Sequence, residues 1–213
     1  MKVGNAQTEA QPTVFVIDDD PAVRQALTSL LRSVNIHAEM FGSPKEFMPE
    51  KLPDAPCCLV LDVRLGSSSG LDLQAELDNA GINIPIVFIT GHGDIPMSVR
   101  AMKAGAVEFL TKPFRDEDLL AAVRVALERD RDQRERNKSL TIIQSRLETL
   151  TPREHEVFAL VATGLMNKQI AAQLGVSEIT VKVHRANLTR KMGARSFVEL
   201  VRMADALKLP FSV

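Results

Sequence analysis

The sequence contains no tryptophan and no tyrosine among its 213 residues. Proteins that stack single-stranded bases need such aromatic platforms, so the composition disfavours that class of nucleic-acid binding. The two cysteines, Cys57 and Cys58, are adjacent, which rules out a disulfide framework within the chain and predicts small buried core residues. No apolar run could span a bilayer and no signal-peptide pattern opens the chain, so we expect a cytoplasmic protein without a membrane partner.

Charge is distributed unevenly, although the formal net charge is only −1. Residues 1–127 hold 11 basic and 17 acidic residues, whereas residues 128–213 hold 15 basic and 10 acidic residues. A chain of this length has room for one or two domains, each with its own core. An acidic half joined to a basic half predicts two domains with different tasks, the second of them on nucleic acid.

Short apolar, β-rich runs alternate with helical patterns through the first half of the chain. The runs cover residues 13–17, 37–41, 57–63, 84–90 and 106–111. Five such repeats predict an α/β fold, a flavodoxin-like doubly wound five-stranded parallel sheet with strand order 2-1-3-4-5. We expect residues 1–12 to form a loose tail and residues 13–127 to form the sheet domain.

The third apolar run carries a single acid, Asp62, near its carboxyl end. A carboxylate within such a strand is costly unless it is paired or used. The predicted strand order brings Asp62 to the same sheet edge as the groups that end strands one, four and five, which are Asp18, Asp19, Thr90 and Lys112.

This set of groups predicts the chemistry of an aspartyl phosphate. The carboxylate of Asp62 attacks a phosphoryl group, and a Mg²⁺ ion relieves the repulsion from Asp18 and Asp19. Thr90 and Lys112 then contact the phosphoryl oxygens. The plainer alternative, that the acids only cap helices and end strands, explains Asp20 well but not the other five groups together.

Charged residues of both signs crowd positions 128–138, which predicts a solvated helix that extends the last helix of the sheet domain. We assign residues 128–147 to a helical linker. Four apolar residues then follow at helical spacing, and they are compatible either with self-association or with packing on a neighbouring domain. These residues are Leu140, Ile143, Leu147 and Leu150.

Residues 148–213 show four helical patterns with a Gly-containing turn between the middle two, which predicts a small all-α helix-turn-helix domain. In the third helix, Val181, Leu188 and Met192 share one face and should pack inward. An exposed Val183 on a basic face suits a thymine methyl group in the major groove. An interaction module that binds no DNA is the alternative. The candidate DNA contacts are Lys168, Thr180, Lys182, Val183, Ala186, Asn187, Arg190 and Lys191.

Several motifs together resemble a known family. Response-regulator receivers carry an acidic pair, a phosphoacceptor Asp, a Thr or Ser and a Lys-Pro after successive strands, and this chain has Asp18-Asp19, Asp62, Thr90 and Lys112-Pro113 in that order. The segments FITGHGDIPM at 88–97 and AMKAGAVEFLTKPF at 101–114 also resemble these receivers. The segments LTPRE at 150–154, NKQIA at 167–171 and TVKVH at 180–184 resemble LuxR-type helix-turn-helix domains. The chain therefore resembles a two-component response regulator of the NarL/FixJ family, with a CheY-like receiver, over nearly its whole length.

The resemblance implies roles for individual residues. Asp62 would be the phosphoacceptor, and Asp19, Asp62 and the backbone carbonyl of Arg64 would bind the metal, with Asp18 helping through water. Thr90 and Phe109 would be the switch residues. A cis peptide bond before Pro113 is also implied.

The implied function is transcriptional regulation that depends on phosphorylation, with no enzyme activity beyond self-phosphorylation and self-dephosphorylation at Asp62. The implied partners are a sensor histidine kinase, double-stranded promoter DNA and a second copy of the phosphorylated chain, and RNA polymerase stays open as a further one. A Mg²⁺-dependent phosphohydrolase is the enzymatic alternative, although it would need a general acid near the nucleophile. The loop at residues 65–70, with Gly and Ser in place of the family's usual Pro, predicts a looser segment beside the site and leaves the phosphate lifetime open.

Overall fold

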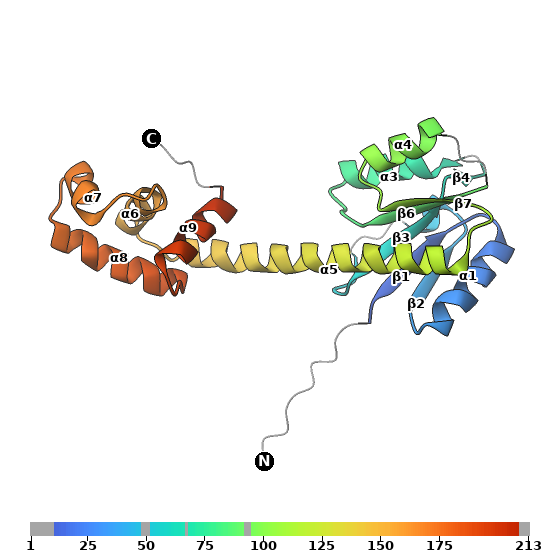
Figure 1. Cartoon of the computed structure of the whole chain (residues 1–213), viewed down its shortest axis with the longest axis horizontal. Helices are drawn as coiled ribbons and strands as arrows, with labels where there is room; N and C mark the ends of the chain where they lie inside the picture. The colour runs from blue at the N-terminus through green and yellow to red at the C-terminus, as the bar shows by residue number, and fades with distance from the viewer. Residues whose placement is uncertain (1–10, 48–51, 67, 92–94, 209–213) are drawn as a thin grey trace, which may run out of the picture. The chain divides into compact units, whose positions relative to one another are not determined.

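The structure is a computed structural model that describes residues 11–47, 52–66, 68–91 and 95–208. By its internal contacts the chain divides into two compact units, residues 1–134 and 135–213 (Figure 1). The predicted domain boundaries stay predictions. Across the described ranges, no helix is both long enough and apolar enough to cross a membrane.

A parallel five-stranded sheet in the order β2-β1-β3-β6-β7 forms the centre of the first unit. This order is the predicted 2-1-3-4-5, so the α/β fold is confirmed. The fourth strand begins two residues later than predicted, because Pro85 has no N–H to donate to a sheet ladder. The strands are β1 (Thr13–Ile17), β2 (His37–Phe41), β3 (Cys57–Asp62), β6 (Ile86–Thr90) and β7 (Glu108–Thr111).

Helices cover both faces of this sheet, as the ribbon shows (Figure 1). Helix α1 (Pro21–Ser33) and the first turns of α5 (Asp116–Leu147) pack on one face. Helices α2 (Pro44–Phe47), α3 (Gly70–Asn79) and α4 (Ile95–Lys103) pack on the other. Because both faces are covered, β1 and β3 are buried along their whole length, which explains their unbroken apolar sequence.

Helix α5 is tied to the start of β3 by a buried acid. Asp130 accepts a hydrogen bond from the backbone N–H of Cys57 at 2.8 Å. Arg134 donates to Asp130 and to the carbonyl of Pro53. This network fixes the amino end of the strand that carries Asp62 at its other end.

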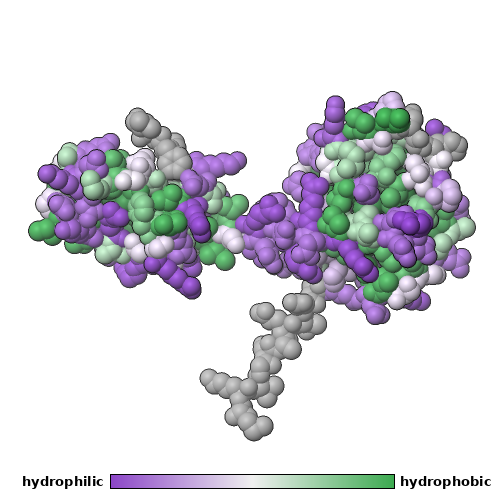
Figure 2. All heavy atoms as spheres, viewed as in Figure 1, coloured by the Kyte–Doolittle hydropathy of each residue, from purple (hydrophilic) through white to green (hydrophobic). Residues whose placement is uncertain are grey.

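Helix α5 continues without a break to Leu147, as the predicted extension of the last sheet-domain helix requires. Its middle part is hydrophilic, which is visible as the purple stretch of α5 in Figure 2. The last turns belong to the second unit, where Ile143 and Leu147 pack against the core and Leu150 is buried. The sequence left two interpretations open for the apolar stripe from Leu140 to Leu150, self-association or packing on a neighbouring domain. Ile143, Leu147 and Leu150 show such packing.

The second unit is a cluster of helices around a core that includes Phe158, Ile170, Val181 and Leu188. Gly175, in the left-handed conformation with φ of +66°, ends one helix and starts the turn to the next. This arrangement is the predicted helix-turn-helix. The helices are α6 (Pro152–Ala162), α7 (Asn167–Leu174), α8 (Glu178–Met192) and α9 (Phe197–Ala206).

Candidate functional sites

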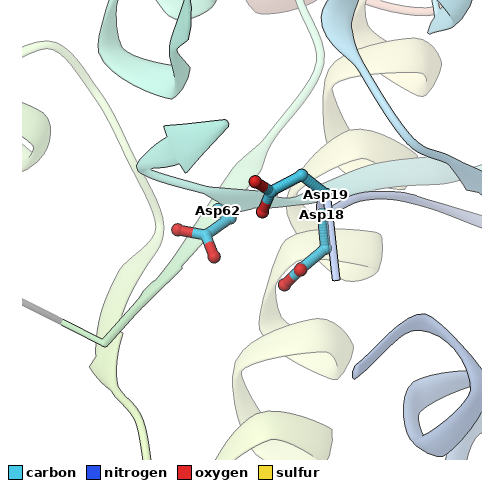
Figure 3. A group of neighbouring side chains, drawn as sticks. All are labelled: Asp18, Asp19 and Asp62. Atoms are coloured by element: carbon cyan, nitrogen blue, oxygen red, sulfur yellow. The ribbon is translucent and has the colours of Figure 1, made fainter. Parts of the chain in front are cut away.

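Three carboxylates meet at the carboxyl edge of the sheet. Asp18 and Asp19 follow β1, and Asp62 ends the neighbouring strand β3, whose Leu61 is paired with Ile17. One carboxylate oxygen from each residue lies within 4.8 Å of the others. Figure 3 shows the three side chains grouped at the ends of their strands. Three oxygen donors at this spacing fit a hard divalent cation such as Mg²⁺.

Lys112 joins two of these acids. Its Nζ donates to Asp18 Oδ2 at 2.6 Å and to Asp62 Oδ2 at 2.7 Å. The other oxygen of Asp62 accepts the backbone N–H of Arg64 at 2.9 Å. The peptide bond from Lys112 to Pro113 is cis, which confirms that prediction. Asp62 is buried, and both of its oxygens are held in place.

Burial and pairing act in opposite directions on the charges of this site. Burial raises the pKa of Asp18 above its ordinary value of 3.8, and the hydrogen bonds from Lys112 and from the Asp20 N–H only partly offset this. Burial by itself would lower the pKa of Lys112, but its bonds to Asp18 and Asp62 outweigh that effect, so its pKa is raised above 10.5. The ammonium group therefore stays charged.

The other predicted receiver residues lie at or near the same edge. Thr90 ends β6 and is fully buried, and its carbonyl accepts the backbone N–H of Lys112 at 2.7 Å. Phe109 in β7 is half-buried, with its ring centre 6.2 Å from that of Phe88. The side chain of Arg64 is exposed, which agrees with a contribution from its backbone alone. The functional roles of these residues stay predictions.

The loop after Asp62 contains structure that the sequence reading missed. Strands β4 (Arg64–Leu65) and β5 (Ser68–Ser69) pair as an antiparallel ladder, where a looser segment was expected. Gly66, with φ of +59°, supplies the left-handed turn residue that such a hairpin needs, and this was the available signal. Gly70 follows, and a Cβ atom there would lie 2.3 Å from the carbonyl oxygen of Asp62. The loop thus packs directly on the backbone of Asp62.

The second candidate site is the outward face of α8. Val181, Leu188 and Met192 are buried, which confirms the predicted inward face. Of the proposed DNA contacts, Lys182, Val183, Ala186 and Arg190 are exposed on α8, Thr180 and Asn187 are half-buried, and Lys168 is exposed on α7.

Three of these side chains have partners inside the unit, and one of them is Lys182, whose Nζ lies 3.4 Å from Glu178 Oε1. Lys191 Nζ donates to Glu154 Oε2 at 2.6 Å and to the carbonyl of Thr149 at 3.0 Å, which favours a structural role over a phosphate contact. The pKa of Glu154 falls below its ordinary 4.5 because of this Lys191 bond and the Thr151 N–H. The hydroxyl of Thr180 lies 2.9 Å from that of Ser177, the N-cap of α8.

Two arginines that sequence reasoning missed hold α8 in position. Arg146, near the end of α5, donates to the carbonyl of Met192 at 2.8 Å, at the carboxyl end of α8. Arg185 donates to Asn167 Oδ1 at 2.6 Å, and its guanidinium lies 5.6 Å from the ring centre of Phe197. Arg185 therefore links α7, α8 and α9. Neither contact has a local sequence signal, because each joins residues far apart in the chain.

Comparison with known proteins identifies both units. Residues 14–124 match the response regulator receiver domain, and residues 148–204 match the LuxR family of bacterial regulatory proteins. The chain belongs to the response regulators that join a receiver domain to a LuxR-type DNA-binding domain.

Individual relatives cover nearly the whole chain. It is 54% identical to nodulation protein W of Bradyrhizobium diazoefficiens over 96% of this chain and 90% of that protein. It is 44% identical to the transcriptional regulatory protein FixJ of Azorhizobium caulinodans, over 90% of each. Among solved structures, the response regulator StyR is similar with a TM-score of 0.78 and 47% identity, over 92% of this chain and 99% of that one. Homologues of this kind are transcriptional regulators.

Proposed function

We propose that this chain is a transcriptional regulator controlled by phosphorylation of Asp62, with a sensor histidine kinase as the phosphoryl donor. One observation carries the proposal: two buried acids share the ammonium of Lys112 at a sheet edge, in a chain whose other unit is a LuxR-type domain. A buried pair of acids is costly to maintain for structure alone.

In the proposed reaction, a carboxylate oxygen of Asp62 forms a bond to phosphorus while the bond between phosphorus and the donor imidazole nitrogen breaks. The imidazole leaves with the electron pair of that bond. Lys112, already 2.7 Å from Asp62 Oδ2, provides positive charge for the phosphoryl oxygens. Thr90 supplies a hydroxyl at the end of the adjacent strand. No turnover of an external substrate is proposed, so the protein would not be an enzyme in the usual sense.

Asp18, Asp19 and Asp62, with the backbone carbonyl of Arg64, are the groups proposed to hold Mg²⁺. When bound, this ion would neutralise the charge that gathers between the acids and the phosphoryl group. Asp19 is the exposed member of the three, so it is the carboxylate most open to an arriving ion.

Phosphorylation is proposed to shift an equilibrium between two conformations that differ in the positions of Thr90 and Phe109. Thr90 would move toward the phosphoryl group, and Phe109, which is half-buried in the described structure, would turn inward behind it. The phosphorylated chain is expected to form a homodimer. RNA polymerase is a further partner in this proposal, and DNA as a partner supports a cytoplasmic location.

DNA recognition is assigned to α8 in the major groove, with Lys182 and Val183 near base edges. Arg190 and Lys168 are assigned to phosphates. The intradomain bonds of Lys191 make it the weakest of the proposed contacts.

The decisive experiment incubates the full chain with a phosphorylated histidine kinase, with Mg²⁺ or with a chelator, and measures the acid-stable and base-labile label. The wild type should be labelled only with Mg²⁺, and Asp62→Asn should not be labelled at all. Asp72→Asn is the matched control, since Asp72 lies in the first turn of α3 outside the acidic cluster, and it should behave as the wild type. Label retained by Asp62→Asn would overturn the assignment.

A further inference from the structure

Helix α8 exposes an isoleucine, Ile179, whose side chain is 73% accessible. It lies nine residues before Leu188, which corresponds to about two and a half turns of helix. Two side chains separated by half-integer turns point in opposite directions, and Leu188 is fully buried. Ile179 therefore stands at the centre of the outward face, close to the amino end of the helix.

Ile179 begins an apolar stripe on this outward face. Val183, 54% accessible, follows at four residues, and the exposed Ala186 at seven, which is the spacing of a single helix face. Such a stripe normally packs on a core, but the core of this unit takes the other side of α8. The exposed cations Lys182 and Arg190 lie on the same outward side. Apolar groups flanked by cations match a DNA groove, where phosphates border the base edges.

The polar groups at this end of α8 already have partners. The Thr180 hydroxyl contacts Ser177, and Lys182 Nζ lies 3.4 Å from Glu178 Oε1. The exposed apolar side chains in the first two turns of α8 can contact a base edge without breaking either of these contacts, beside the base-edge contact already proposed for Lys182.

We propose that Ile179 and Val183 are specificity-determining residues that contact the C5-methyl groups of two thymines in the major groove. This inference rests on the proposed placement of α8 in that groove. Thymine is the base that presents a methyl group there. Isoleucine and valine are branched at Cβ and nearly fixed at χ1 within a helix, so they keep a defined apolar surface. Four residues of helix rise by about 6 Å, so the two methyl groups should lie about two base pairs apart.

The test uses the full-length protein activated with beryllofluoride. Selection from a random duplex pool gives a preferred site, and each thymine of that site is then replaced by uracil, which removes the methyl group and keeps the base pair. The wild type should lose about fourfold in affinity at each of two nearby positions, the value of one buried methyl group. In Ile179→Ala one of these two losses should disappear, and in Val183→Ala the other.

Ile142→Ala is the matched control, because Ile142 is 52% accessible and belongs to α5. This variant should keep both uracil losses. If Ile179→Ala also keeps both, or if the wild type tolerates uracil at every position, the inference is overturned while sequence-specific binding stands. If the pool yields no preferred sequence, the proposed function fails and this inference fails with it.

Discussion

The acidic site of the receiver and the outward face of α8 are assembled in different ways. Asp18, Asp62 and Lys112 are separated by up to 94 residues, and only the order of the parallel strands brings them to one edge. The outward face of α8 comes from one continuous helix of 15 residues. A site built by topology is rigid and mutually dependent, whereas a site built on one helix face can be changed residue by residue. Substitutions should therefore have larger and more coupled effects in the first unit.

The largest effect should come from Lys112→Met, which leaves the buried Asp18 and Asp62 without their shared cation. Removing one partner of a buried ion pair costs about 3–5 kcal/mol. The loss at pH 7 should shrink as the pH falls, because burial already raises the pKa of Asp18 and protonation removes the unpaired charge. Urea unfolding with a chelator at pH 7 and pH 5 measures both effects.

Thiol labelling is a suitable second probe at pH 7, since the only two cysteines of the sequence, Cys57 and Cys58, lie buried in β3. Burial raises the pKa of Cys57 to about 11, so the folded protein should react slowly. A second variant, Asp18→Asn with Lys112→Met, should recover part of the stability. Equal stability of the wild type and Lys112→Met at pH 7 would contradict a coupled site.

A smaller loss is expected from Gly70→Ala, because the new Cβ would lie 2.3 Å from the carbonyl oxygen of Asp62. Overpacking of this kind costs about 1–3 kcal/mol and should also displace Asp62 and slow its phosphorylation. Gly91→Ala is the matched control, since nothing described lies within 4 Å of its added Cβ. Phosphorylation rates of the two variants with a small phosphodonor would separate them, and equal rates would count against a tightly packed loop.

In the second unit, Glu154→Gln should remove a stability that depends on pH. The folded-state pKa of Glu154 is lowered, so its contribution is present above the ordinary value of 4.5 and is lost as the pH falls through the folded value. The wild type should lose about 1–2 kcal/mol between pH 5 and pH 3 that the variant lacks. Hydrogen exchange of peptides from α6 and α8 at the two pH values provides the measurement. An identical pH response in the two proteins would show that the bond between Lys191 and Glu154 does not stabilise the contact between α8 and α6.

An effect no larger than that of Glu154→Gln should come from Arg185→Ala, which removes the bond to Asn167 and the contact with Phe197. A partly exposed hydrogen bond and a cation–π contact together are worth about 1–2 kcal/mol. Arg185→Lys should recover part of this, because it keeps the charge over the ring but loses the planar donor. Thermal unfolding should rank the wild type as most stable, Arg185→Lys as intermediate and Arg185→Ala as least stable. An Arg185→Lys variant that is less stable than Arg185→Ala would contradict this ranking.

The acidic site was predictable from sequence because parallel strands end at a common edge. Once Asp62 was placed in β3, the adjacent strands β1 and β6 brought Asp18 and Thr90 to the same edge, and the next strand, β7, brought Lys112 there. The inward face of α8 was predictable for a similar reason, since helical spacing fixes which residues share a side. In both cases a backbone periodicity carries the information.

What escaped prediction depends on long side chains and on a short loop. Arg146 and Arg185 have several rotatable bonds, and their partners, Met192 and Asn167, are chosen by how helices pack rather than by any repeat. The same holds for Lys191, which sequence reading placed among the candidate DNA contacts and whose partners are Glu154 and Thr149. The β4–β5 ladder has two residues in each strand, too few to show the alternation that identifies a strand.

The bond between Arg146 and the end of α8 bears on how regulators of this kind can be recombined. The LuxR match begins at residue 148, yet the compact second unit begins at residue 135 and includes Ile143, Arg146 and Leu147. A chimera that splices a foreign receiver at residue 148 would discard Arg146, which donates to Met192, and would also remove Ile143 and Leu147, which pack against the core of the second unit. Junctions placed upstream of residue 135 would keep α8 and the residues that support it in one exchangeable module.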